Sequence, residues 1–171
     1  MSTYYLISSL PMLSLDSQPL ITAEAFVEAC RAQLNAEDAG AAEALIRNTP
    51  SQHPFVLAWR DKDSLLRNAI ARARARLADT DAERWIRQTE GCDTSIALLV
   101  DDAFEQPDPL KREKEIDEVR WLIAESLQGY DPMSVSVALG YAIKLTLALR
   151  WANLNVDAGR ETFKQLTRNK S

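Results

Sequence analysis

The second half of the chain contains two long helix-forming segments that are separated by a very short connection. The first segment covers 109–128, with Asp108 placed as its N-cap and Gly129 as the residue that ends it. The second segment covers 134–154, is strongly apolar and begins at Ser134. Because so few residues join the two segments, they are predicted to pack as an antiparallel pair of helices.

The rest of the chain is also predicted to be mostly helical. Apolar residues recur at the helical period in segments that begin at capping residues, and glycine is scarce, with 5 residues in 171. The predicted elements are helices that start after Thr22, Asn35 and Asp93, a long helix at about 55–78, a short helix that carries Trp85, and a final helix that starts at Asp157. The expected fold is therefore all-α, an antiparallel bundle or array of seven or eight helices.

Two segments depart from the helical pattern. Residues 4–15 are rich in β-formers and are interrupted by Pro11, which predicts a short extended segment packed against helices, with room for one edge strand. Residues 49–54 contain two prolines and form the best candidate for a hinge between subdomains. The whole chain, 1–171, is otherwise expected to form a single helical domain.

Charge and hydropathy exclude some classes of function. The formal net charge is −5 and the isoelectric point is near 5.0, which argues against general nucleic-acid binding. The most apolar run, 135–151, includes Lys144 and Arg150, so it is interpreted as a buried helix and not as a membrane-inserted one. The N-terminus has no signal-peptide pattern, and the cytoplasm is the expected location.

The sequence contains no motif typical of a catalytic or cofactor site. Glycine-rich phosphate loops, nucleophile motifs and zinc motifs are all absent, so no cofactor, metal or nucleotide is expected. The single histidine, His53, is predicted to be a solvated loop residue. Cys30 lies on an apolar helical face, which favours a reduced thiol in the core, and its distance from Cys92 fits no metal pattern.

Charged residues within the two long helices favour a buried ion-pair network. Buried charges cost several kcal/mol unless they are paired, so carboxylates of the first helix should meet basic residues of the second. The residues assigned to this structural network are Glu113, Asp117, Arg120, Lys144 and Arg150. A structural role is favoured over a catalytic one, because ion pairs of this kind are common in protein cores.

A basic patch on the predicted helix 55–78 is the candidate contact for a partner. It consists of Arg67, Arg72, Arg74 and Arg76. Long basic side chains often cover the apolar border of a helix, and this interpretation is preferred to a binding patch for an acidic partner. Base-stacking aromatic residues do not alternate with these arginines, which again speaks against nucleic acid.

Several short blocks of the sequence form a recognisable set, namely 4–11, 107–110, Glu113, 116–117, 120–121, 129–130, 141–142, 144–145, 150–151 and Gly159. Together they resemble a poorly characterised bacterial family whose genes lie among those of V-type (A/V-type) ATP synthases. The resemblance implies a stand-in for the C subunit, the helical piece that joins the central stalk to the membrane rotor ring. It also implies a location at the inner face of the membrane through that complex. A full C subunit is considerably longer and consists of three similar helical bundles.

Three hypotheses about function remain open at this point. The first is a non-catalytic subunit of a rotary ATPase, with the central stalk and the rotor ring as partners, or a factor that helps to assemble them. The second is a free-standing helical adaptor or regulator that binds another soluble protein. The third, an enzyme that uses the region of Glu113 and Asp117, is the least favoured.

Overall fold

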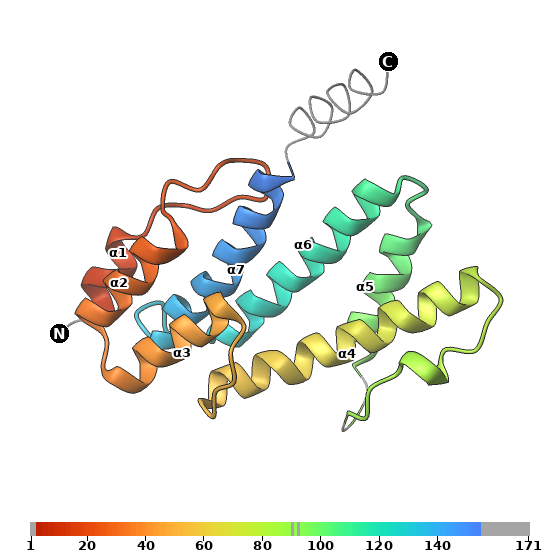
Figure 1. Ribbon diagram of the computed structural model, residues 1–171, viewed down its shortest axis with the longest axis horizontal. Helices are drawn as coiled ribbons and strands as arrows, with labels where there is room; N and C mark the ends of the chain where they lie inside the picture. Colours follow the sequence, from red (N-terminus) through yellow and green to blue (C-terminus); the bar gives the residue numbers. More distant parts are fainter. Residues whose placement is uncertain (1–2, 90, 92, 155–171) are drawn as a thin grey trace, which may run out of the picture.

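The protein is an array of α-helices (Figure 1). A computed structural model describes residues 3–89, 91 and 93–154. These residues form the helices α1 (Thr3–Ser9), α2 (Ala23–Gln33), α3 (Ala36–Arg47), α4 (Pro54–Leu77), α5 (Thr94–Glu105), α6 (Pro109–Gln128) and α7 (Val135–Asn153), with a 3-10 turn, η1 (Glu83–Trp85). No strand occurs among the described residues, which confirms the predicted all-α class.

Local capping explains where most helices begin and end. Thr22 and Asn35 accept hydrogen bonds from backbone amides in the first turns of α2 and α3, at 3.1 and 2.9 Å. Asp108 caps α6 in the same way, and Gly129 ends this helix with a φ of 72°. These boundaries agree with the predicted ones. The helix expected to start at Asp157 lies outside the described residues.

The prediction of an extended N-terminal segment is wrong for its first part. Residues Thr3–Ser9 form α1, whose Leu6 is 1% exposed and packs with α2 and α7. The isolated sequence favours strand because of its aromatic and β-branched residues, but burial of one helical face outweighs that local preference. The segment after Ser9 is irregular, and the Tyr141 hydroxyl of α7 donates a hydrogen bond to the Pro11 carbonyl at 2.9 Å.

Two hydrophobic clusters share α4 and α6. The first cluster joins α1, α2, α3, α7, the first turn of α4 and Ala124 of α6, with Phe26 stacked on Tyr141 at a centroid distance of 5.3 Å. The second cluster joins α4, α5 and α6 around Leu66, Val100 and Ile116. The side chains of Trp59 and Leu127 pack against both clusters.

The helix α7 is the most apolar element and forms one wall of the first cluster. By length and composition alone, Val135–Asn153 could cross a membrane, a weak signal that buried core helices also produce. Eight of its residues are buried against α3, α6 and neighbouring helices. Figure 1 shows α7 running antiparallel to α6, as predicted. This packing is compatible with a soluble protein.

Candidate partner-binding groove

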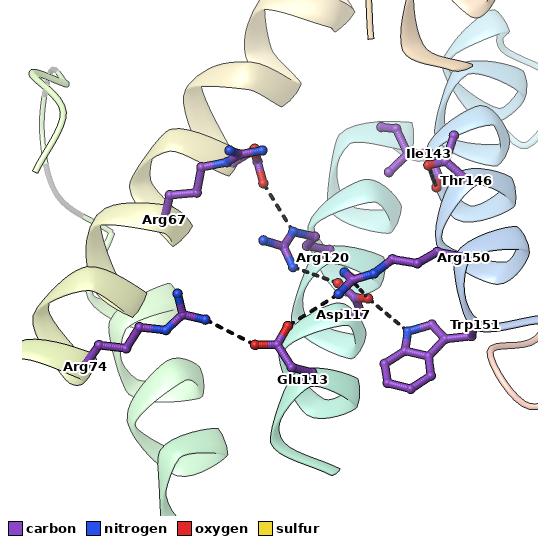
Figure 2. A network of polar contacts seen from close by, with 10 residues as sticks. Arg67, Arg74, Glu113, Asp117, Arg120, Ile143, Thr146, Arg150 and Trp151 are labelled. Carbon is purple, nitrogen blue, oxygen red and sulfur yellow. Dashed lines mark hydrogen bonds and ion pairs between the residues drawn. The ribbon is translucent and has the colours of Figure 1, made fainter. Parts of the chain in front are cut away.

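A buried carboxylate, Asp117, is the centre of a polar network that connects three helices (Figure 2). Its side chain is 0% exposed. One oxygen accepts a hydrogen bond from Arg120 Nη1 at 2.7 Å, and the other accepts from Arg150 Nη1 at 2.8 Å and Trp151 Nε1 at 2.9 Å. Three donors on one carboxylate, two of them charged, offset much of the desolvation cost of its burial.

The network continues outward from Asp117 in two directions. On one side Arg120 contacts Asp63 at 3.3 Å, and on the other side Arg150 contacts Glu113 at 3.4 Å. Each outer carboxylate pairs with a further arginine of α4, at 2.6 and 3.1 Å. The complete chain of alternating charges runs through Arg67, Asp63, Arg120, Asp117, Arg150, Glu113 and Arg74. Four arginines against three carboxylates leave a formal excess of one positive charge.

Helical spacing explains why these side chains meet. On α6, Glu113, Asp117 and Arg120 lie at i, i+4 and i+7, so they share one face of the helix. On α4, Asp63 and Arg67 are also four residues apart. In Figure 2 the α4 arginines reach across toward α6, and Arg150 and Trp151 approach Asp117 from α7.

A solvent-open groove of about 590 Å³ lies along this network. Its polar lining includes four arginines and one carboxylate, and its apolar lining comes mainly from small residues of α4 and from Ile116 of α6. The lining residues are Arg67, Ile70, Ala71, Arg74, Ala75, Ala78, Thr80, Trp85, Glu113, Ile116, Arg120 and Arg150. The groove combines an apolar surface with guanidinium groups, which suits a ligand that is both acidic and apolar.

The structure brings four of the five predicted network residues together and leaves one out. Lys144 contacts Glu125 at 3.3 Å and lies over the Trp121 ring at 5.1 Å, so its assignment to the Asp117 network needs correction. The reason is the antiparallel register, in which Lys144 is nearly two turns closer to the α6–α7 turn than Arg150 is. Lys144 therefore faces Glu125, which is also closer to that turn than Asp117 and Glu113 are.

Four members of the network were not predicted as such, and two of them, Arg67 and Arg74, were assigned to the basic patch instead. Trp151 was not assigned to the network, but its indole nitrogen donates to Asp117. Asp63 lies on a different helix from the predicted residues, and the signal that could have found it is its i, i+4 spacing to Arg67. A sequence pattern on α4 alone does not reveal that the other partner of Asp63 is Arg120 of α6.

The predicted basic patch is divided between two sides of α4. Arg67 and Arg74 line the groove. Arg76 pairs instead with Asp101 of α5. Arg72 is exposed and has no ion pair with any described residue. Only half of the patch therefore belongs to the groove.

His53 is not the solvated loop residue that the sequence predicts. Its side chain is 13% exposed and occupies the N-cap position of α4, where Nδ1 accepts a hydrogen bond from the Phe55 amide at 3.2 Å. The Nε2 atom lies 3.1 Å from Asp38 of α3. His53 therefore ties the start of α4 to the first turn of α3 across the loop that was predicted as a candidate hinge. Among the residues that the structure covers, no group of three histidine, cysteine or acidic side chains could hold a metal.

Comparison with protein families gives a match to part of the chain. A family model described as "Protein of unknown function (DUF2764)" matches residues 97–169. This stretch includes α6, α7 and the network residues Glu113, Asp117, Arg120 and Arg150, whereas the α4 side of the groove lies before it. No curated protein and no solved structure matches the chain.

Proposed function

We propose that this chain is a non-catalytic component of a bacterial V-type ATP synthase or ATPase, with a role like that of the C subunit. In this role it links the central stalk to the membrane rotor or helps to assemble them, on the cytoplasmic face of the membrane. The proposal takes its choice of partner from the sequence resemblance, which involves residues of α1, α6 and α7.

The structural observation that supports this proposal most is the connection of the three longest helices through Asp117. The helices α4, α6 and α7 have 24, 20 and 19 residues. A carboxylate that receives donors from α6 and α7, and reaches α4 through Arg120 and Asp63, resists sliding of these helices past one another. A protein that transmits torque, or holds a stalk in place, needs helices that are stiff in this way.

The same contacts argue against an enzyme at Glu113 and Asp117. A general acid or base must reach the proton that it transfers. Asp117 is fully buried, and both of its oxygens already accept hydrogen bonds. Glu113 is engaged with Arg74 and Arg150. Both carboxylates are thus engaged in contacts within the fold, as is usual for residues with a structural role.

A free-standing adaptor is the second candidate, and the groove is the observation that favours it. A surface that combines arginines with apolar residues binds a protein segment whether or not that segment belongs to an ATPase. The two candidates differ in the partner that they require.

The test is affinity purification of the tagged chain from its native cells, followed by mass spectrometry. The rotary ATPase proposal predicts recovery of central-stalk and rotor-ring subunits from detergent-solubilised membranes in comparable amounts. An equally expressed tagged protein of the same net charge is the control. Recovery of one unrelated soluble protein without any stalk or rotor protein would replace the proposal with the adaptor.

A further inference from the structure

The two outermost arginines of the network lie two helical turns apart on the same helix, α4. Arg67 and Arg74 are seven residues apart on α4, which places them two turns, or about 10.5 Å, apart along one edge of the groove. Their side chains are 49% and 64% exposed. Each has one ion-pair partner among the described residues, and a guanidinium has five N–H donors, so each has donors left for another acceptor.

The surface between these arginines is apolar and made largely of small side chains. Ala71 and Ala75 of α4 lie beside Ile70 and the buried Ile116 of α6. Alanines let another backbone approach closely, whereas the two isoleucines, 7% and 1% exposed, form the floor of the groove. Trp85, with 57% of its surface exposed, lies at the groove as a further apolar residue.

We propose that this groove binds an amphipathic α-helix of a partner protein, with two carboxylates seven residues apart and apolar side chains between them. The inference rests on the proposed function, because it specifies the partner chemistry of the same site. An α-helix laid along α4 has the same rise per residue, so its carboxylates at i and i+7 match Arg67 and Arg74. Residues at i+3 and i+4 of the bound helix then face Ala71, the partly exposed groove residue between the two arginines.

The charge of the groove favours this ligand over a highly charged one. The network has a formal excess of a single positive charge, and Glu113 itself lines the groove. A nucleic acid or polyphosphate would bring many negative charges close to that carboxylate, in a protein whose net charge is −5. Two separated carboxylates on a helix meet the two exposed arginines and place apolar side chains against the rest of the groove.

The experiment uses the purified full chain and a fluorescein-labelled, lactam-bridged helical peptide. The peptide carries two glutamates seven positions apart and leucines at the third and fourth positions between them. Fluorescence anisotropy should show saturable binding that weakens as the salt concentration is raised from about 0.02 M to about 0.5 M. A peptide of the same composition with its glutamates on opposite helical faces is the ligand control.

The matched protein variants come from the divided basic patch. The Arg67→Gln/Arg74→Gln variant should weaken binding about tenfold, because two charge-assisted contacts are lost. The Arg72→Gln/Arg76→Gln variant removes the same number of charges from α4 outside the groove and should bind within about twofold of wild type. Thermal unfolding of both variants checks that each is folded.

Four outcomes would overturn the proposal. They are equal weakening by the two double variants, equal binding of the two peptides, equal binding of an unstructured peptide of the same charge, and a concentration-dependent dimer in ultracentrifugation that Arg67→Gln/Arg74→Gln abolishes. The last outcome would make a second copy of this chain the occupant. The experiment contains no ATPase component, so its result is separate from that of the purification test.

Discussion

The Asp117 carboxylate of α6 accepts a hydrogen bond from the indole nitrogen of Trp151, 34 residues later on α7, at 2.9 Å. The tryptophan lies in the last turn of α7 and belongs to neither hydrophobic cluster, but it donates to a fully buried charge. This contact joins α6 to the C-terminal end of α7, so loss of the network should destabilise the packing of these two helices.

Replacement of Asp117 by alanine is expected to be the most damaging change in the network. It leaves Arg120 and Arg150 without their shared carboxylate, at a cost on the order of 3–5 kcal/mol of unfolding free energy. Trp151→Phe removes one donor and should cost less, roughly 1–3 kcal/mol. Urea unfolding measures both. Glu118→Gln removes an exposed charge from the next position of α6 and is the control, expected within about 0.5 kcal/mol of wild type. Wild-type stability of Asp117→Ala would contradict the network.

Lys144 and Arg150 should respond differently to replacement by alanine, although they lie on the same helix. Lys144→Ala removes a pair with Glu125, whose side chain is 46% exposed, and a cation–π contact, so a loss of about 1 kcal/mol is expected. Arg150→Ala takes one of three donors from the buried Asp117 and should cost roughly 2 kcal/mol. Calorimetric unfolding of the two variants gives the comparison. A larger loss for Lys144→Ala would show that the observed register is wrong.

Stability at acidic pH is expected to depend on Asp93, the N-cap of α5. The hydrogen bond from the Lys62 ammonium, at 2.6 Å, and then that from the Ser95 hydroxyl hold the pKa of this carboxyl below its usual value of 3.8. A lowered folded-state pKa stabilises the fold above the unfolded-state pKa, and this contribution disappears as the pH falls through the folded-state value. Stability should therefore decline below about pH 4.

Two variants separate this effect from the capping effect. Asp93→Asn keeps an N-cap side chain but cannot titrate, so its unfolding free energy should change less between pH 6 and pH 3, taken as approximate limits. Lys62→Ala keeps the carboxylate and removes the largest cause of the lowered pKa of Asp93. The unfolding free energy of this variant should therefore also change less over the same pH range. If both variants follow the wild-type curve, other carboxylates determine the acid stability.

The thiol of Cys30 should be unreactive in the folded protein. Its side chain lies in the first hydrophobic cluster with 0% exposure, and burial raises the pKa of the thiol to about 12. The thiolate is the nucleophile, so at pH near 8 alkylation has to wait for unfolding. In a Cys92→Ser background, labelling by iodoacetamide should follow the unfolding curve in urea. Complete labelling in buffer within minutes would mean that α2 opens without global unfolding.

Helix positions could be predicted from the sequence because their signals are local. A cap such as Asp108 and a stop such as Gly129 act within a few residues of the chain, and the structure confirms both. Partnerships between helices depend on register, which no local signal encodes. For this reason Lys144 was assigned to the wrong carboxylate, whereas Arg150 meets both of the carboxylates that were predicted for it.

The limits of periodicity are visible in α1 and at the end of α4. Leu77 continues the apolar stripe of Leu66 and Ile70 but is 65% exposed, because the last turn of α4 extends beyond the cluster that buries the others. Residues of α1 were predicted to be extended and became helical through burial of Leu6. In both cases the neighbours in space, and not the residue pattern, decided the outcome.

The long helix α4 belongs to two cores at once. Its first turn, with Phe55 and Val56, lies in the first cluster, and its middle, with Leu66 and Ala73, lies in the second. A single uninterrupted helix of 24 residues, about 36 Å long, therefore passes from one core to the other. A displacement of the groove end of α4 is therefore expected to move its first turn in the first cluster, because no loop lies between the two. Binding at the groove and packing of the first cluster should then be mechanically coupled through this one helix.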